Sequence, residues 1–317
     1  MTDTQNEVFK TPVNKIRLFE HGAPGSQNLK LTRKYYTEDM PDGRVKHIVQ
    51  NITDPDIVPY MPDGIGNSTD RQRIPAVLII PGGAFRRLVY NFEGEDVAKW
   101  LNSMGIAAFV LECRLPSDEH DNAEDVPLID AMRAMRVIRG RAQEFGIDEA
   151  KIGVMGFSAG GFMAALLSTA YESDVYADYK YKDEYDKLSA RPDFAVCSYP
   201  VISIDDCIEA GKRYMSEEQV LERISDSKAK ILHKYNPDKL VRPDMPPVFI
   251  CETDDDRTTL SENSVGFYMA ARKAGVSAEL HIFRTGGHGY GCGDDFAQTG
   301  EWKVLFTKWI KSIEIIS

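Results

Sequence analysis

The stretch that decides the fold is "KIGVMGFSAGGFMAALLS", residues 151–168. Its first part is a short apolar run typical of a buried strand, and its last part is rich in Ala, Leu and Met, which favours a helix. Between them lies Ser158, with Gly156 two residues before it and Gly160 two residues after it. A Gly-x-Ser-x-Gly pattern at a strand-to-helix junction is typical of a sharp turn that raises the serine hydroxyl above the edge of a sheet. Because three such positions also recur by chance, the interpretation depends on finding partners for Ser158.

Length and composition exclude several classes of function. The chain has 317 residues, 43% of them hydrophobic, and a net charge of −11. The length suits one large α/β domain or two small ones, and the negative charge argues against nucleic acid or an anionic membrane as a partner. We expect a cytoplasmic protein, because "MTDTQNEVFK" at the start has no apolar core and no apolar run is long enough to span a membrane. The five cysteines form no metal-binding motif, so neither a metal nor another cofactor is expected.

Short apolar runs alternate with helical patterns along most of the chain. Strands are predicted at 45–52, 56–61, 75–80, 107–113, 151–156, 193–199, 247–253 and 278–283. Helices are predicted at 94–104, 125–145, 158–170, 261–275 and 299–313. Such alternation predicts a doubly wound, mostly parallel sheet of α/β class. The first two strands leave no room for a helix between them and are expected to be antiparallel.

The same patterns suggest how the chain is divided. Residues 1–44 are polar and are interpreted as an N-terminal extension, and residues 45–317 as one catalytic domain. A stretch of about 203–245, before the seventh strand, breaks the alternation and is predicted to be a small helical insertion. We expect it to lie over the C-terminal edge of the sheet, where open α/β sheets bind ligands.

A nucleophilic serine needs a base and an acid that orients the base. His288 lies in "RTGGHGYGCG", in a glycine-rich loop just after the last predicted strand. After the seventh strand, "FICETDDDRTT" offers Asp254, Asp255 and Asp256, and the residues themselves do not decide among them. The chain order of Ser158, an aspartate and then His288 is that of α/β-hydrolases.

Acyl transfer also needs N–H donors that bind the oxyanion. The loop "IIPGGAF", residues 79–85, follows the third predicted strand, and its glycines allow the backbone to approach a ligand closely. By position, the donors are expected to be the N–H groups of Gly83, Ala84 and, after the nucleophile, Ala159.

Several longer strings resemble one group of proteins. They are "IPGGAF" (80–85), "EGEDVAKWLNSMGIAAFVLECRLP" (93–116), "DVPLIDAMRAMRVIR" (125–139), "GVMGFSAGG" (153–161), "RPDFAVCSYPVIS" (191–203), "PPVFICETDDD" (246–256) and "ELHIFRTGGHGYG" (279–291). Over roughly 50–315 the chain resembles bacterial α/β-hydrolases of the acetylxylan-esterase-like group, relatives of hormone-sensitive lipase and prolyl oligopeptidase. The resemblance implies an eight-stranded α/β-hydrolase fold. It also implies that the first member of an Asp-Asp pair orients the histidine, which places the acid at Asp255, with Asp254 as the alternative. One departure is Ala84, where these families usually carry a third glycine.

The resemblance implies a serine carboxylesterase that hydrolyses short-chain esters, such as acetyl groups on a sugar or another small alcohol. One alternative is a prolyl-oligopeptidase-like peptidase, although the propeller domain of those enzymes is absent from this sequence. The other is a hydrolase-fold binding protein without turnover, against which the intact set of serine, aspartate and histidine argues. A homodimer is left open.

Further residues have predicted roles near the loops. Phe85, Phe157 and Tyr290 flank the catalytic residues in sequence and are predicted to line the acyl pocket. Glu93 is expected to be a solvated carboxylate at a helix start, with a substrate contact as the alternative.

Two predictions are structural. Arg114 and Asp130, which the resemblance brings in, are expected to form a buried ion pair between a strand and a helix. The five tyrosines within 171–185 are expected to pack on the domain, with stacking on sugar rings as the alternative.

Overall fold

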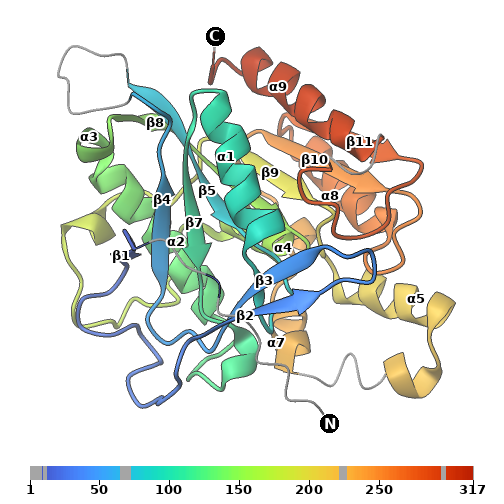
Figure 1. Ribbon diagram of the computed structural model, residues 1–317, viewed down its shortest axis with the longest axis horizontal. Helices are drawn as coiled ribbons and strands as arrows, with labels where there is room; N and C mark the ends of the chain where they lie inside the picture. Colours follow the sequence, from blue (N-terminus) through green and yellow to red (C-terminus); the bar gives the residue numbers. More distant parts are fainter. Residues whose placement is uncertain (1–8, 10–12, 65–72, 221–226, 294–297, 317) are drawn as a thin grey trace.

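A mostly parallel sheet of eight strands forms the centre of the molecule (Figure 1). The computed structural model describes residue 9 and residues 13–64, 73–220, 227–293 and 298–316. In spatial order the strands are β1 (Ile16–Arg17), β4 (Asp56–Tyr60), β7 (Ala107–Glu112), β5 (Ile74–Ile80), β8 (Ile147–Phe157), β9 (Ala195–Ser198), β10 (Val248–Thr253) and β11 (Ala278–Phe283). β4 is antiparallel to both of its neighbours, and every pair from β7 to β11 is parallel. The mostly parallel eight-stranded sheet predicted from the sequence is therefore confirmed.

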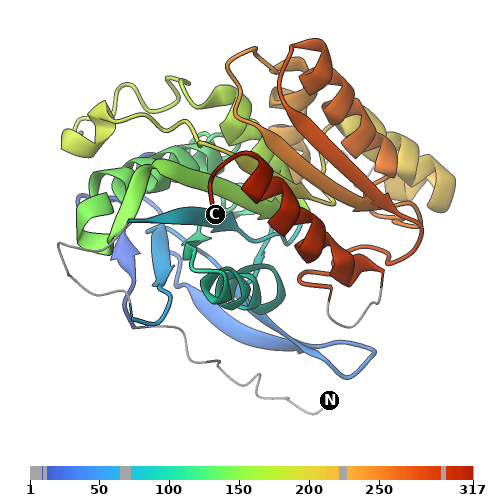
Figure 2. The ribbon, with the colours of Figure 1, turned by 90° about the horizontal axis from the view of Figure 1, so that it is seen from above.

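Helices cover both faces of this sheet (Figure 2). The longer ones are α1 (Asp96–Ser103), α2 (Val126–Gly140), α4 (Ala159–Ala170), α5 (Ile204–Tyr214), α7 (Ser227–Lys234), α8 (Ser261–Lys273) and α9 (Trp302–Ser312). Short helical turns are η1 (Asn91–Glu95), η2 (Pro116–Asp118), α3 (Ala142–Phe145), η3 (Glu184–Lys187), η4 (Pro237–Lys239) and η5 (Thr299–Glu301). α1 and α9 share one face, where the rings of Trp100 and Trp302 are 4.9 Å apart. α2, α4 and α8 lie on the other.

A second, three-stranded sheet corrects the prediction for the N-terminal part. β3 (Val45–Gln50) pairs with β2 (Lys34–Asp39) and β6 (Leu88–Val89), and not with β4. The predicted antiparallel pairing of 45–52 with 56–61 is therefore wrong, and β1 takes the place beside β4. The reason is local: "MPDG" (40–43) forms a hairpin turn, with Gly43 at φ 85°, so β3 folds back on β2. The predicted boundary at residue 44 thus falls inside a hairpin.

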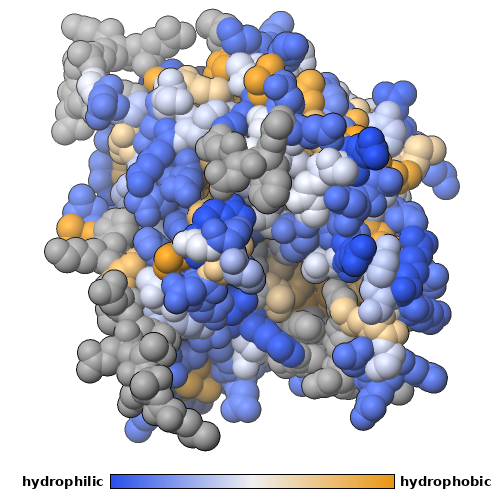
Figure 3. Space-filling model, turned by 45° about the vertical axis from the view of Figure 1, so that its right-hand side comes forward, coloured by the Kyte–Doolittle hydropathy of each residue, from blue (hydrophilic) through white to orange (hydrophobic). Residues whose placement is uncertain are grey.

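The insertion predicted near 203–245 contains α5, α7 and η4. Its residues 221–226 lie outside the described residues. In the part of the chain that the structure describes, no helix has both the length and the apolar character needed to cross a membrane. The face in Figure 3 is mostly hydrophilic, with hydrophobic side chains scattered over it.

The tyrosines of 171–185 mostly pack on the domain, as expected. Tyr171 and Tyr176 are buried, whereas Tyr181 is 42% exposed. The hydroxyl of Tyr179 donates to the carbonyl of Gly22, 2.9 Å away, which ties this segment to the N-terminal part of the chain.

The predicted ion pair between Arg114 and Asp130 is confirmed and anchors the N-terminal segment. Both side chains are fully buried, and the guanidinium donates to Asp130 Oδ1 at 2.6 and 3.0 Å. A further guanidinium N–H donates to Ser26 Oγ at 2.8 Å, and Ser26 Oγ lies 3.0 Å from His120 Nδ1. Since Ser26 Oγ accepts from Arg114, its own proton can be donated to Nδ1, which favours a neutral imidazole.

The stability of the fold should depend on the protonation of His120. Burial and the nearby charge of Arg114 lower the pKa of His120 to about 4, from an ordinary value of about 6.5. Between these two values the unfolded chain binds a proton that the folded protein does not, so the free energy of unfolding falls as pH drops through this window. We expect a loss of about 1–2 kcal/mol from this group after allowing for solvent screening.

Urea unfolding at neutral pH and near pH 4.5 measures this loss. His120→Gln keeps an acceptor for Ser26 but cannot take up a proton, so its stability should fall less than that of the wild type. An equal fall in the two proteins would contradict the assignment.

Candidate active site

Ser158 occupies a strained turn between the end of β8 and the start of α4. Its φ is 54° and its ψ is −118°, a region that non-glycine residues rarely adopt. A side chain at Gly156 would overlap the carbonyl oxygen of Gly160, and one at Gly160 would overlap that of Ile80. Both glycines are therefore required by packing, and the turn presses against the end of β5.

His288 reaches Ser158 from the loop after β11. Its Nε2 lies 2.8 Å from Ser158 Oγ, and its side chain is 20% exposed. The ring of Tyr199 packs edge-on against the imidazole, with the ring centroids 5.0 Å apart. The loop bends through Gly287 and Gly289, both with positive φ. The structure thus brings together the serine and the histidine that the sequence singled out.

The aspartate beside His288 is Asp256, and the predicted Asp255 is one residue too early. Asp256 Oδ2 lies 2.6 Å from His288 Nδ1, and the Asp256 side chain is fully buried. Asp255 is exposed and instead accepts the N–H of Gly287 at 2.8 Å, and the alternative, Asp254, is also exposed. β10 ends at Thr253, and the turn after it directs only the third aspartate inward.

The surroundings of Asp256 keep its carboxylate ionised. Burial acts to raise its pKa, but hydrogen bonding and the charge of His288, with two backbone N–H donors, outweigh burial and hold the pKa of Asp256 below its ordinary value. Those donors are the N–H groups of Thr258 and Thr259, at 2.7 and 2.9 Å from Oδ1. An ionised Asp256 accepts the Nδ1 proton of His288. This arrangement leaves Nε2 free to accept the proton of Ser158.

The loop predicted to bind the oxyanion lies beside the serine. Gly83, Ala84 and Phe85 follow one another with φ of 137°, 58° and 61°, so the chain after β5 turns sharply there. Gly83 and Ala84 line the same cavity as Ser158. The volume of this cavity is about 240 Å³. Ala159 is the first residue of α4, and its N–H belongs to the unsatisfied first turn of that helix.

A buried chain of hydrogen bonds that the sequence did not reveal joins the two loops. Glu93 accepts the N–H of Gly82 at 2.8 Å and the hydroxyl of Tyr199 at 2.9 Å. Tyr199 in turn accepts the N–H of Gly291 at 3.0 Å. Glu93 is only 5% exposed, so the prediction of a solvated carboxylate is wrong. Burial raises the pKa of Glu93, and the hydrogen bond from Tyr199 is the largest opposing effect.

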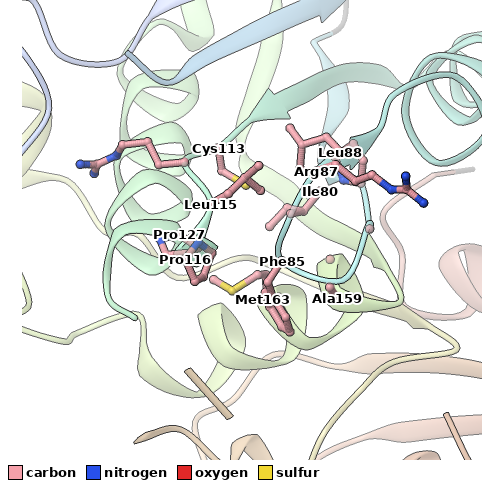
Figure 4. Close-up of a pocket in the computed structure, with 14 residues that line it drawn as sticks. Ile80, Phe85, Arg87, Leu88, Cys113, Leu115, Pro116, Pro127, Ala159 and Met163 are labelled. Atoms are coloured by element: carbon pink, nitrogen blue, oxygen red, sulfur yellow. The ribbon is translucent and has the colours of Figure 1, made fainter. Parts of the chain in front are cut away.

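Two of the three residues predicted to line an acyl pocket belong to the core. Phe157 is fully buried against Trp302, and Tyr290 is buried against Tyr199, with ring centroids 6.3 and 4.5 Å apart. Phe85, in contrast, borders a small apolar cavity beside the nucleophile turn, together with Met163 (Figure 4). The free space in that cavity is about 10 Å³, which is roughly the room that one water molecule needs.

Within the described ranges, no group of three or more His, Cys, Asp or Glu side chains is arranged to hold a metal ion.

The chain is similar to several known proteins. The BD-FAE family model matches residues 63–270. An acetylxylan esterase of Xylanibacter ruminicola is 31% identical over 240 residues, which are 75% of this chain and 45% of that protein. Endo-1,4-beta-xylanase B of Butyrivibrio fibrisolvens is 31% identical over 220 residues, 69% of this chain and 33% of that protein. The chain thus spans less than half the length of these two relatives.

A solved structure matches over nearly the whole chain. The acetyl ester-xyloside bifunctional hydrolase of Caldicellulosiruptor lactoaceticus is 33% identical, with a TM-score of 0.70. The match covers 96% of this chain and 97% of that one.

Substitution of the three aspartates should separate their roles. Asp256→Asn should lower kcat for p-nitrophenyl acetate by about 10³- to 10⁴-fold, because an amide cannot hold the required imidazole tautomer. Asp255→Asn and Asp254→Asn are matched controls and should stay within about threefold of the wild type. The carboxylate bonded to His288 belongs to Asp256, and an asparagine oxygen can still accept the Gly287 N–H. A larger loss in Asp255→Asn than in Asp256→Asn would restore the original prediction.

Glu93→Gln should impair turnover without unfolding the protein. The amide can accept only one of the two hydrogen bonds from Gly82 and Tyr199 well, so the oxyanion loop loses part of its support. We expect kcat to fall roughly 10- to 100-fold, somewhat less than for the removal of an oxyanion donor itself, while KM changes little. Glu95→Gln, in the same helical turn, is the matched control. Equal kinetics in the two variants would exclude a positioning role for Glu93.

Proposed function

The chain belongs to the BD-FAE family, and we propose that it is a serine carboxylesterase that removes short acyl groups, above all acetyl, from a sugar or another small alcohol. The observation that carries the proposal is the continuous set of hydrogen bonds from Ser158 through His288 to Asp256. Two of the similar proteins add support, because one is an acetylxylan esterase and the other an acetyl ester-xyloside bifunctional hydrolase.

In the proposed reaction, Ser158 Oγ attacks the ester carbonyl while His288 Nε2 takes its proton. Asp256 holds the imidazole in the required tautomer and stabilises the imidazolium that forms. The N–H groups of Gly83, Ala84 and Ala159 are the proposed donors to the oxyanion. The tetrahedral intermediate then collapses, and His288 gives the proton to the departing alcohol oxygen.

Water completes the proposed cycle. His288 removes a proton from a water molecule, whose oxygen attacks the acyl carbonyl, and the bond to Ser158 Oγ breaks. The proton returns to Ser158 Oγ and the carboxylic acid leaves. Each step uses the same hydrogen-bonded pair, so no cofactor is required by this route.

A preference for short acyl groups follows from the packing beside the nucleophile. Ala84 carries a methyl group where related loops often have glycine, and Phe85 lies at the edge of a cavity with free space of about 10 Å³. Longer acyl groups of a substrate would overlap the side chains of Ala84 and Phe85. Packed sites resist extra methylenes by about 1–3 kcal/mol. A cytoplasmic location and a homodimer stay predictions from the sequence.

The proposal is tested with p-nitrophenyl acetate, butyrate and octanoate. Ser158→Ala should lose labelling by a fluorophosphonate probe and at least about 10⁴-fold in kcat. Butyrate should be hydrolysed roughly tenfold to a hundredfold more slowly than acetate. An aminoacyl anilide serves as the peptidase control.

Activity that survives in Ser158→Ala would refute the mechanism. A rate that rises with chain length would refute the short-acyl preference, since each buried methylene would then contribute about 0.8 kcal/mol of binding.

A further inference from the structure

Three basic side chains line the cavity that contains Ser158 and His288. They are Arg44, Lys46 and Arg87. Arg44 and Lys46 come from the β2–β3 hairpin, and Arg87 comes from the segment just before β6. The whole chain carries a net charge of −11. Basic side chains therefore cluster at this cavity, although the chain as a whole is acidic.

The acidic partners of two of these cations stand outside the cavity. Arg44 pairs with Asp42 at 2.8 Å, and Arg87 pairs with Glu38 at 2.5 Å. Asp42 and Glu38 are partly exposed, with 49% and 34% of their side chains accessible, and neither lines the cavity. These ion pairs hold the guanidinium groups of Arg44 and Arg87 at the wall of the cavity.

Lys46 is differently placed. Within the described part of the chain it forms no ion pair, and it is half-buried. The positive charge of Lys46 acts to lower the pKa of Glu93, the acidic residue that lines the same cavity. The Glu93 oxygens already accept hydrogen bonds from Gly82 and Tyr199. Three cations therefore face the cavity against one carboxylate that is engaged elsewhere, with Asp256 fully buried behind His288.

The chemistry of the site decides which part of a substrate meets these cations. His288 must protonate the departing alcohol oxygen, so the alcohol half extends from Ser158 toward His288. His288 and Gly289 line this same cavity with Lys46, whereas Phe85 and Met163 border the small apolar cavity. Arg87 lines both cavities, so Lys46 is the cation that distinguishes them. The alcohol half is consequently the part that enters the basic cavity.

We propose that this cavity selects esters whose alcohol half carries a carboxylate, such as an acetylated acidic sugar, which Lys46 and Arg87 bind. The inference rests on the proposed esterase function and names its substrate class. A guanidinium recognises a carboxylate through a planar pair of donors, and a lysine contributes a compact charge. The volume of about 240 Å³ admits one ring with its substituents.

The test compares the release of acetate from 3-acetoxybenzoate and from its neutral methyl ester, each rate divided by the rate of hydroxide-catalysed release of acetate. At low salt, kcat/KM should be roughly tenfold higher for the anion, as one favourable charge contact of about 1.4 kcal/mol gives. Raising the ionic strength from about 0.01 M to about 0.5 M should shrink this ratio, because salt screens exposed charges.

Substitutions locate the effect. Lys46→Met and Arg87→Met should each lower the ratio of anionic to neutral kcat/KM by roughly three- to tenfold, in proportion to the lost charge contact. Lys311→Met, at the exposed end of α9, removes the same charge far from the cavity and should keep the wild-type ratio. Circular dichroism and thermal melting confirm that each variant is folded.

The outcomes separate the two proposals. If neither ester is hydrolysed in a Ser158-dependent way, the esterase function fails. If both are hydrolysed but the wild type does not favour the anion, or if Lys46→Met and Arg87→Met keep the wild-type ratio, selection for an anionic alcohol is wrong while the esterase function stands. A carboxylate placed instead on the acyl half, as in a succinate monoester, should give a smaller preference that Lys46→Met leaves unchanged, because Lys46 lines only the larger cavity. An equal or larger preference there would overturn the assignment of the cavity.

Discussion

The lack of space around the turn at Ser158 is the constraint on which the rest of the site depends. Neither Gly156 nor Gly160 can carry a side chain, because the backbone of α4 lies directly against the end of β8 and against Ile80 at the end of β5. The same contact fixes the loop that follows β5. One close backbone approach therefore sets both the position of the nucleophile and the position of the predicted oxyanion donors.

Polar groups buried behind the site extend this constraint to the remaining loops. Glu93 and Tyr199 connect the loop after β5 to the loop that carries His288. Asp256 is held by two N–H groups of its own turn and so presents a fixed oxygen to the imidazole. Buried polar networks of this kind are costly unless every member is paired, and here the pairings also fix the loops that flank Ser158 and His288.

Local patterns predicted the parts of the molecule that local sequence determines. The parallel strands are continuous apolar runs, and the glycines around Ser158 mark a turn that few sequences can form. The acid was predicted one residue too early. Three adjacent aspartates cannot be told apart in the sequence, and only the turn after β10 shows which of them is buried. Phe157 lies next to Ser158 in sequence, but the alternation of a strand directs it into the core. Glu93 could not be recognised, because its partners Gly82 and Tyr199 meet it only in the folded protein.

The hairpin that includes Arg44 and Lys46 belongs to a different sheet from the nucleophile, and it precedes the segment matched by the BD-FAE family model. In the proposed function, selection of the alcohol half and cleavage of the ester bond are consequently supported by separate sheets. A change of residue in the hairpin is expected to alter the proposed substrate preference without moving Ser158, His288 or Asp256. During evolution the small sheet is therefore able to change in sequence independently of the turn that holds Ser158.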